Sequence, residues 1–355
     1  MSDKMVDLRS DTITLPTEEM REAMARAPLG DDVYGEDPTV NRLQELAAEK
    51  VGMAAALYVP SGTMGNTCAL LAHTNWGDEV LFEEQAHMYY WEAGTYANLA
   101  GLAARAVRGE YGIVSADQIH ANVRGDNPHF APLKLVCIEN THNNYAGQAW
   151  SVEELVAVSA ACRARGLKLH MDGARVFNAA VAMGVDARDY TRHVDSVMFC
   201  VSKGLSAPVG SLLCGSRAFV EAAYRWRKGR GGAMRLGGVV AAAGVVALEQ
   251  MVDRLAEDHA VAQALGVGLG AIEGVAVVFP PRPTNILKVD FAELGWLAAE
   301  VVWRWKERGV LCNPRPPHGA RLVVNRHVGL GDVEYVVEVT REMLERGETL
   351  QEPVH

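Results

Sequence analysis

Two charged residues follow apolar segments that are expected to form buried strands. Lys203 comes just after the apolar segment 196–201, and Asp172 directly follows the segment 167–171. A charge beside a buried strand is costly unless it has a partner or a task. An amine and a carboxylate at the ends of two neighbouring parallel strands are what pyridoxal phosphate requires. The lysine forms a Schiff base with this cofactor, and the aspartate keeps its pyridine nitrogen protonated.

Each of these two residues also has an ordinary interpretation. Asp172 precedes Gly173 and could simply cap the next helix, and Lys203 could be a surface lysine. Lys134 and Lys168 lie where apolar segments begin, which is the edge of an α/β sheet that does not bind ligands. Because Asp172 and Lys203 both follow their segments, and one helical crossover fits between them, we favour the cofactor interpretation.

A turn suited to phosphate follows the apolar segment 55–59 and opens an apolar helix. It reads Ser61-Gly62-Thr63-Met64-Gly65-Asn66. Small residues let backbone N–H groups approach a phosphate at the positive end of a helix. The alternative is an ordinary strand-to-helix turn capped by Ser61. The turn matches neither a P-loop nor a GxGxxG fingerprint, which disfavours nucleotide-binding classes.

Two histidines could act at the same edge of the sheet. His87 follows the apolar segment 79–82, and there it could stack on a cofactor ring and move protons. A lone histidine near a strand end is more often structural. His142 follows the apolar segment 133–138 and is the better placed of the two.

Two arginines could hold a substrate carboxylate. Arg175 comes three residues after Asp172 and would point into the same crevice, where its guanidinium could bind a carboxylate with two hydrogen bonds. Arg321 begins the apolar segment 322–324 and would face a cleft between two domains. From position alone, Arg321 is better explained as a solvated arginine at a strand end.

These residues require a sheet that brings strand ends together. Helical patterns at 17–27 and 39–51 are followed by alternating apolar and helical segments, which is typical of a mostly parallel sheet covered on both faces. The expected strands are 55–59, 79–82, 133–138, 167–171, 196–201 and 211–214.

The C-terminal part of the chain has a different pattern. A helical stretch from 234 to about 272 is expected to bridge two domains. The segments that follow predict a small α+β domain: strands at 275–279, 286–291 and 322–324, and helices at 297–308 and 332–346. We therefore expect a large cofactor-binding domain over 1–250, with an N-terminal arm over 1–16, and a small domain over 251–355.

Composition excludes several classes of protein. The 355 residues contain 34 Lys and Arg against 44 Asp and Glu, a net charge of −10, and no basic block stands out, which argues against nucleic acid as a partner. The first residues lack the apolar core of a signal peptide, and the apolar stretch 237–248 is too short to span a membrane. The scattered cysteines favour reduced thiols in a cytoplasm. They are Cys68, Cys137, Cys162, Cys200, Cys214 and Cys312.

The motifs together resemble the threonine aldolase family of pyridoxal phosphate enzymes, whose fold is of the aspartate aminotransferase type. The resemblance covers nearly the whole chain. It is carried by residues 7–12, 30–41, 61–63, 139–143, 172–178 and 202–211. It implies an α/β large domain with a mostly parallel sheet and a smaller α+β domain. It also implies a homotetramer whose active sites lie between subunits, and it implies no catalytic metal.

The resemblance implies a role for each candidate residue. Lys203 would carry the Schiff base, Asp172 would pair with the pyridinium, and His87 would stack on the ring. Gly62 and Thr63 would bind the phosphate, and Ser10, Arg175 and Arg321 would bind the substrate carboxylate. His142 would lie near the β-hydroxyl. Tyr34 and Arg235 would contact the site of the neighbouring subunit.

The implied reaction is retro-aldol cleavage of an L-β-hydroxy-α-amino acid, such as threonine, allo-threonine or phenylserine, to glycine and an aldehyde. The base could be His142, His87 or a bound water. A β-eliminating lyase or dehydratase on the same scaffold is the alternative. A non-catalytic relative is disfavoured by the intact Lys203, Asp172 and Arg175. Three segments, 144–146, 231–235 and 325–327, differ from the usual sequence of the family. The first and the third lie near the residues expected to bind the substrate.

Overall fold

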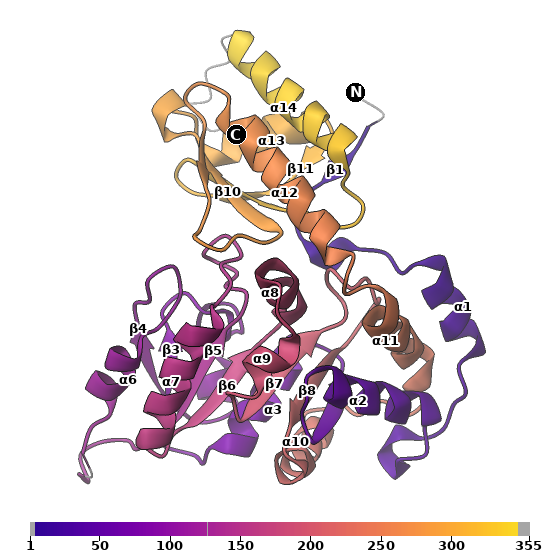
Figure 1. Cartoon of the computed structure of the whole chain (residues 1–355), viewed down its shortest axis with the longest axis vertical. Coiled ribbons are helices and arrows are strands. Elements are labelled where there is room, and N and C mark those ends of the chain that lie inside the picture. The colour runs from indigo at the N-terminus through magenta and orange to yellow at the C-terminus, as the bar shows by residue number, and fades with distance from the viewer. Residues whose placement is uncertain (1–3, 126, 347–355) are drawn as a thin grey trace.

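A computed structural model describes residues 4–125 and 127–346 of the chain. It has a large N-terminal part with a central sheet and a smaller C-terminal part that lies at one end of it (Figure 1). No helix among the described residues is long and apolar enough to cross a membrane.

The large part is built on a seven-stranded sheet in the order β2-β8-β7-β6-β5-β3-β4. Its strands are β2 (Ala55–Val59), β3 (Glu79–Glu83), β4 (Ala103–Val107), β5 (Leu133–Glu139), β6 (Lys168–Asp172), β7 (Ser196–Cys200) and β8 (Ser211–Gly215). Only β8 runs antiparallel to its neighbours, so the prediction of a mostly parallel sheet is confirmed. Strand β4, at the edge of the sheet, was not among the strands expected from the sequence.

Helices cover both faces of this sheet, and side-chain caps mark where several of them begin. Thr17, Asp37 and Ser61 accept backbone hydrogen bonds at the starts of α1, α2 and α3. The helices of this part are α1 (Glu18–Arg26), α2 (Pro38–Lys50), α3 (Gly62–His73), α4 (His87–Tyr90), α5 (Thr95–Asn98), α6 (Ala116–Asn122), α7 (Val152–Ala164), α8 (Val176–Met183), α9 (Ala187–Thr191), α10 (Arg217–Gly229) and α11 (Gly238–Gln250), with 3-10 turns η1 (Asp11–Ile13) and η2 (Asp32–Tyr34).

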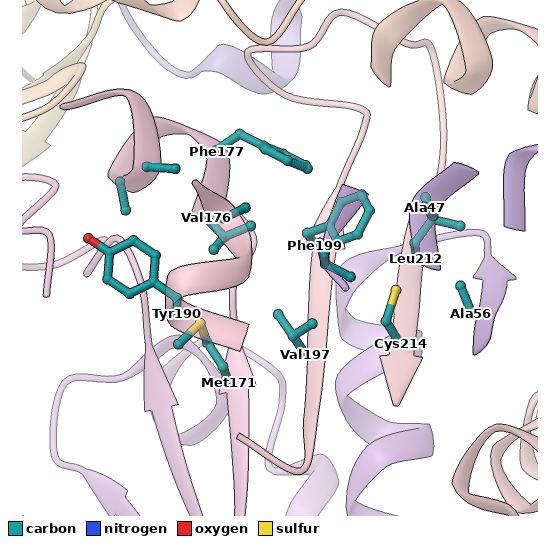
Figure 2. Close-up of a cluster of buried hydrophobic side chains, with 14 of the residues drawn as sticks. Ala47, Ala56, Met171, Val176, Phe177, Tyr190, Val197, Phe199, Leu212 and Cys214 are labelled. Atoms are coloured by element: carbon teal, nitrogen blue, oxygen red, sulfur yellow. The ribbon is translucent and has the colours of Figure 1, made fainter. Parts of the chain in front are cut away.

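The main hydrophobic core lies between the sheet and the helices on one face. Met171 and Val197 lie near Val176 of α8 and Tyr190 of α9, and Leu212 of the next strand lies beside Ala47 of α2 (Figure 2). Burial of such side chains stabilises each by about 1.5–3 kcal/mol. This packing fixes the position of the end of β6, which carries Asp172, relative to the end of β7, after which Lys203 follows.

The C-terminal part has its own core. Its four-stranded antiparallel sheet has the order β12-β13-β10-β9. The elements are α12 (Leu255–Gly270), β9 (Ala276–Val278), β10 (Ile286–Asp290), η3 (Ala292–Leu294), α13 (Ala298–Glu307), β11 (Val310–Leu311), β12 (Asn313–Arg315), β13 (Gly319–Val323) and α14 (Leu330–Glu345). Strand β1 (Val6–Asp7) pairs with β11, and Val6 and Leu8 belong to this second core. The N-terminal arm therefore crosses from the small part to the large one, and the domain boundary at residue 250 stays a prediction.

One prediction about helices is wrong, and another gains detail. The single helix expected over 234–272 is two helices, α11 and α12, separated by the turn 251–254. The expected helical crossover between Asp172 and Lys203 is present, joins two parallel strands, and contains two short helices, α8 and α9. Gly184, at φ 64°, ends α8 in the left-handed conformation that favours glycine, and Asp186 caps α9. Neither break changes the edge of the sheet at which the strands end.

Candidate active site

Residues from four strand ends meet at the carboxyl edge of the large sheet. Asp172 is the last residue of β6 and lies opposite Glu139 of β5 and Met198 of β7. Lys203 follows β7 by three residues, in the loop that leads to β8, and is half-buried. His87 begins α4, just after β3. The structure therefore brings Asp172, Lys203 and His87 to one edge of the sheet.

Asp172 is a buried carboxylate whose two oxygens both accept hydrogen bonds. Oδ2 accepts from Asn66 Nδ2 at 2.9 Å, and Oδ1 accepts from the backbone N–H of Ala174 at 3.0 Å. The side chain is only 2% exposed. These two hydrogen bonds fix the plane of the carboxylate, which would pair with the ring nitrogen of the cofactor.

Asn66 connects Asp172 to a second buried carboxylate. Its Nδ2 also donates to Glu92 Oε1 at 2.9 Å, and the same oxygen lies 2.8 Å from His87 Nδ1. Donor atoms of His87, Glu92 and Asp172 lie within 4.8 Å of one another, a spacing that a metal could also bridge. Asn66 and the imidazole already satisfy Glu92 Oε1, so we interpret this group as a hydrogen-bond network. The expectation of no metal stays a prediction.

The network raises the pKa of His87. Burial by itself lowers the pKa of this imidazole, but the hydrogen bond to Glu92 and the charges of Asp172 and Glu139 outweigh burial and bring the pKa above its ordinary value. Because Nδ1 faces Glu92, Nε2 is the ring nitrogen left to contact a ligand. The side chain is 33% exposed, so a ligand can reach it.

A chain of buried polar groups sets the orientation of the Asn66 amide. His170 Nε2 lies 3.1 Å from Asn66 Oδ1, and His170 Nδ1 lies 2.8 Å from Ser196 Oγ, which is 2.7 Å from His73 Nε2. Burial lowers the pKa of His170 to about 3 and that of His73 to about 4. Both imidazoles are therefore neutral at pH 7. An Nε2–H tautomer of His170 donates to the amide oxygen and leaves Nδ2 to serve both carboxylates.

We expect Asn66→Ala to weaken cofactor binding. Without the amide, Asp172 and Glu92 lose a shared donor, and two carboxylates at close range repel each other. The dissociation constant for pyridoxal phosphate, measured by absorbance titration, is expected to rise about tenfold, the effect of one hydrogen bond to a charged group. Asn98→Ala, at an exposed asparagine, is the matched control and should leave it unchanged. An unaltered constant in Asn66→Ala would contradict this role.

The turn before α3 fits a phosphate. The backbone N–H groups of Gly62 and Thr63 have no acceptor within the described part of the chain, whereas Ser61 Oγ accepts from Met64 N at 3.1 Å. A Cβ at Gly62 would lie 3.1 Å from Met198 Cε, so glycine allows α3 to pack closely on β7. These free N–H groups, together with the Asp172 carboxylate and the Lys203 amine, fit pyridoxal phosphate.

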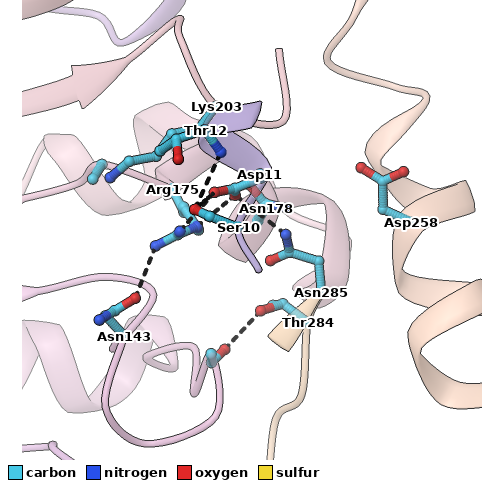
Figure 3. A network of polar contacts seen from close by, with 12 residues as sticks. Ser10, Asp11, Thr12, Asn143, Arg175, Asn178, Lys203, Asp258, Thr284 and Asn285 are labelled. Atoms are coloured by element: carbon cyan, nitrogen blue, oxygen red, sulfur yellow. Dashed lines mark hydrogen bonds and ion pairs between the residues drawn. The ribbon is translucent and has the colours of Figure 1, made fainter. Parts of the chain in front are cut away.

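Arg175 is held by a buried aspartate that the sequence analysis did not single out. Its Nε and a terminal nitrogen lie 2.7 Å from the two oxygens of Asp11, and both residues are buried (Figure 3). Burial raises the pKa of Asp11, but Arg175 and, more weakly, Lys203 and Arg321 overcome this and hold that pKa well below its usual value. Asp11 therefore stays ionised and fixes the plane of the guanidinium.

Asn143 links Arg175 to Arg321. Its Oδ1 accepts from Arg321 at 2.5 Å and from the other terminal nitrogen of Arg175 at 3.5 Å. Burial, with repulsion from Arg175, lowers the pKa of Arg321 to about 9, and its Nε has no partner within the described part of the chain. Both arginines remain cationic at pH 7. They share a single anion, Asp11, so a further carboxylate is favoured between them.

Ser10 lies beside this pair of arginines. Its Oγ accepts from Thr12 N at 3.2 Å and lies 3.5 Å from Asp11 Oδ1 (Figure 3). Thr14 Oγ1 lies 2.7 Å from the backbone carbonyl of Lys203, which ties the N-terminal arm to the loop that carries the lysine. The structure thus brings together the three predicted carboxylate-binding residues, Ser10, Arg175 and Arg321.

His142 lies deeper than the resemblance implied. Its side chain has no exposed surface, and Nε2 is 3.0 Å from Glu83 Oε2 and 3.7 Å from Glu139 Oε2. Nδ1 has no partner within the described residues, and Tyr145 packs on the ring with its own ring centre 5.0 Å away. His142 is therefore placed to support Glu83 and Glu139. A role at the β-hydroxyl stays a prediction that this geometry does not favour.

Tyr34 and Arg235, the candidates for contact with a neighbouring subunit, form one surface patch. Tyr34 is 74% exposed, and Arg235 is exposed and pairs with Asp31 at 3.0 Å. The segments are joined because Asp32 N donates to the carbonyl of Arg235 at 2.8 Å. Leu236 follows Arg235 and is 56% exposed, which adds apolar surface to the patch. Their contact with a second subunit stays a prediction.

The fold and the site define the class of pyridoxal phosphate-dependent lyases. The family model described as beta-eliminating lyase matches residues 7–292. The chain therefore belongs to the beta-eliminating lyase family, and several of the curated proteins that it matches are named threonine aldolases.

Two curated relatives and one solved structure illustrate the similarity. The low specificity L-threonine aldolase of Escherichia coli (strain K12) is 43% identical over 349 residues, 96% of this chain and 100% of that protein. The low-specificity L-threonine aldolase 1 of Arabidopsis thaliana is 39% identical over 355 residues, 99% and 98% of the two chains. The threonine aldolase of Leishmania major has the same fold, with a TM-score of 0.81 at 20% identity, over 95% of this chain and 99% of that one.

Proposed function

We propose that this enzyme cleaves L-β-hydroxy-α-amino acids, such as threonine, allo-threonine or phenylserine, to glycine and an aldehyde. The observation that carries this proposal is the cradle formed by Ser10, Arg175 and Arg321 beside Lys203, at the edge of the sheet where Asp172 lies. The names and high identities of the aldolase relatives support it. When bound, pyridoxal phosphate accepts the electron pair that is released at Cα as the Cα–Cβ bond breaks.

The cradle decides which bond breaks. Arg175 and Arg321 would hold the α-carboxylate of the substrate and so fix one bond of Cα, while Lys203 would attach the cofactor and Asp172 would hold it at its ring nitrogen. We infer that this combination would favour cleavage of the Cα–Cβ bond over the other bonds at Cα. Because Asp11 locks the guanidinium of Arg175, the carboxylate meets a preorganised donor. A β-eliminating lyase would instead align the Cα–H bond.

The geometry favours His87 as the group that takes the β-hydroxyl proton. Glu92 binds Nδ1 of His87, which leaves the lone pair of Nε2 for the substrate in the neutral imidazole. His142 has neither an exposed atom nor a free Nε2. A base of this kind contributes about 10²–10⁴-fold to a rate. Because the pKa of His87 is raised, its neutral form becomes available at a higher pH than for an ordinary histidine.

We expect Glu92→Gln to move the acidic limb of the pH–rate profile to lower pH. Loss of the Glu92 charge removes one cause of the raised His87 pKa, so the imidazole becomes neutral at a lower pH. The measurement is kcat/KM for threonine from pH 5 to 9. The control is Glu84→Gln, which removes a partly exposed carboxylate that follows β3 but is not among the causes of the His87 shift. An acidic limb that stays in place would assign the base elsewhere.

The reverse reaction tests the proposed function. The loaded enzyme is incubated with glycine and acetaldehyde, and the products are separated by chiral chromatography. An aldolase forms threonine and allo-threonine of the L series. A β-eliminating lyase has no leaving group on glycine and forms neither, which would contradict the proposal.

We also propose a homotetramer in which Tyr34 and Arg235 approach the site of a neighbouring subunit. The exposed patch that contains Tyr34, Arg235 and Leu236 supports this assembly. A cytoplasmic location is proposed as well, supported by the six cysteines, which are all buried and free. Sedimentation analysis of the cofactor-loaded enzyme measures the number of subunits in the assembly.

A further inference from the structure

A row of cations crosses the small sheet next to the substrate cradle. Lys288 of β10 lies directly opposite Arg321 of β13, and Arg321 lies directly opposite Asn313 of β12. Arg315 is two residues beyond Asn313, so its side chain lies on the same face of the strand. Lys288 and Arg315 therefore flank Arg321, which binds Asn143 at the cradle.

Both flanking cations face aromatic rings of the large part. Lys288 Nζ is 5.9 Å from the centre of the Tyr145 ring, and the guanidinium of Arg315 is 5.8 Å from the Trp91 ring. Tyr145 contacts His142 and lies in the loop after β5, and Trp91 ends the short helix that His87 begins. The two cations thus lie next to the loops that also carry Asn143 of the cradle and the proposed base, His87.

The charges around the cradle do not balance for a substrate with a single carboxylate. Asp11 neutralises Arg175, and the α-carboxylate would neutralise Arg321. Lys288 and Arg315 remain. Within residues 4–125 and 127–346, neither forms an ion pair with a carboxylate, and Arg315 donates only to the carbonyl of Pro314 at 3.1 Å.

These two cations are also partly withdrawn from water. Burial, together with repulsion from Arg315 and Arg321, lowers the pKa of Lys288, and burial lowers the pKa of Arg315. A half-buried cation without an anion is unfavourable, and an anionic ligand would relieve it. These two cations are therefore unfavourable in the free protein, and a ligand that carries more than one negative charge would stabilise them.

Space for a ligand group exists next to Lys288. Lys288 and Tyr145 border a cavity of about 460 Å³ that is open to solvent. Arg108 and Glu110 lie on its wall, one charge of each sign, so the wall does not neutralise Lys288. A group the size of a carboxylate fits this volume.

We propose that Lys288 and Arg315 form an anion subsite that selects β-hydroxy-α-amino acids whose side chain ends in a carboxylate. This inference rests on the proposed function, because the cradle must hold the α-carboxylate for the side chain to reach Lys288 and Arg315. The smallest such substrate is β-hydroxyaspartate. Its Cα–Cβ bond would break to give glycine and glyoxylate: the hydroxyl loses its proton, and Cα gains one, so that atoms and charge balance.

Equilibrium binding tests the subsite without requiring turnover. L-Aspartate and L-asparagine have nearly the same shape, differ by one negative charge, and lack the β-hydroxyl that aldol cleavage needs. Calorimetric titration of the cofactor-loaded enzyme gives both dissociation constants. Aspartate is expected to bind at least tenfold more tightly, as for one hydrogen bond to a charged group, and the preference should fall with rising ionic strength.

Variants assign this preference to the two residues. Lys288→Met and Arg315→Met should each reduce the ratio of the two dissociation constants roughly tenfold. Lys134→Met, at an exposed lysine on the strand β5, is the matched control and should leave the ratio unchanged. Equal binding of aspartate and asparagine, or a preference that survives both variants, would overturn the proposal.

Cleavage separates this inference from the proposed function. We expect kcat/KM for β-hydroxyaspartate to exceed that for its neutral isostere β-hydroxyasparagine, and the excess to fall in both variants. Cleavage of threonine without any preference for the charged substrate would overturn the subsite alone. Preferential aspartate binding with no cleavage of any β-hydroxy amino acid would overturn the proposed function and leave the subsite standing.

Discussion

Lys203→Ala is expected to abolish both covalent attachment of pyridoxal phosphate and aldol cleavage. Lys203 is the half-buried amine that follows β7 beside the cradle, and Asp172 ends the neighbouring strand. Loss of the amine removes the attachment point and a group able to move protons at Cα. Proton transfer by a positioned group contributes about 10²–10⁴-fold, so activity should fall at least that far.

Mass spectrometry after borohydride reduction measures the attachment directly. The wild-type enzyme should retain the cofactor's mass on the peptide that contains Lys203, and Lys203→Ala should not. Lys168→Ala is the control, because Lys168 lies at the opposite edge of the sheet and pairs with Asp195 at 2.8 Å. A cofactor label on any other lysine, with activity retained in Lys203→Ala, would refute the assignment.

Asp11→Asn is expected to damage both stability and substrate binding. Asp11 holds Arg175 with two contacts of 2.7 Å in a site that is fully buried. Removing one partner of a buried ion pair typically costs about 3–5 kcal/mol, because the other charge is left uncompensated. Arg175 would also lose its fixed orientation, so we expect KM for threonine to rise about tenfold while the cofactor stays attached.

The acid dependence of stability provides a second measurement for Asp11. The folded-state pKa of Asp11 lies below its unfolded value, so its stabilising effect is fully present above the unfolded pKa and is lost as pH falls towards the folded pKa. The difference in unfolding midpoint between wild type and Asp11→Asn should therefore narrow below about pH 4. Glu36→Gln, an exposed carboxylate, is the control. A constant difference across this range would contradict the ion-pair account.

The residues at strand ends could be predicted from the sequence because their signal is local. Apolar segments mark the buried strands; Asp172 directly follows one, and Lys203 and His87 come two and five residues after the ends of two others. The caps Thr17 and Ser61 are likewise local signals. Strand β4 was missed because it is an edge strand whose alanines and arginine leave it largely exposed, so it lacks an apolar run.

The supporting residues of the site could not be predicted because their partners are distant in the chain. Asp11 is 164 residues from Arg175, and Asn66 is 106 residues from Asp172. Asp11 and Asn66 both lay in motifs that the sequence analysis quoted, but nothing local indicates which side chain either one contacts. Glu92 gave no separate signal, because a glutamate in a loop, here the one between α4 and α5, is usually exposed. The depth of His142 also depends on tertiary packing, against Glu83 and Tyr145.

The products formed from L-threonine test the central claim most directly. The cofactor-loaded enzyme is incubated with L-threonine, and glycine, acetaldehyde, 2-oxobutanoate and ammonia are quantified together. If the cradle aligns the Cα–Cβ bond, glycine and acetaldehyde appear in equal amounts and account for the threonine consumed. If 2-oxobutanoate and ammonia account for it instead, the enzyme is an eliminating lyase or dehydratase, and the proposed role of the Arg175–Arg321 cradle is wrong.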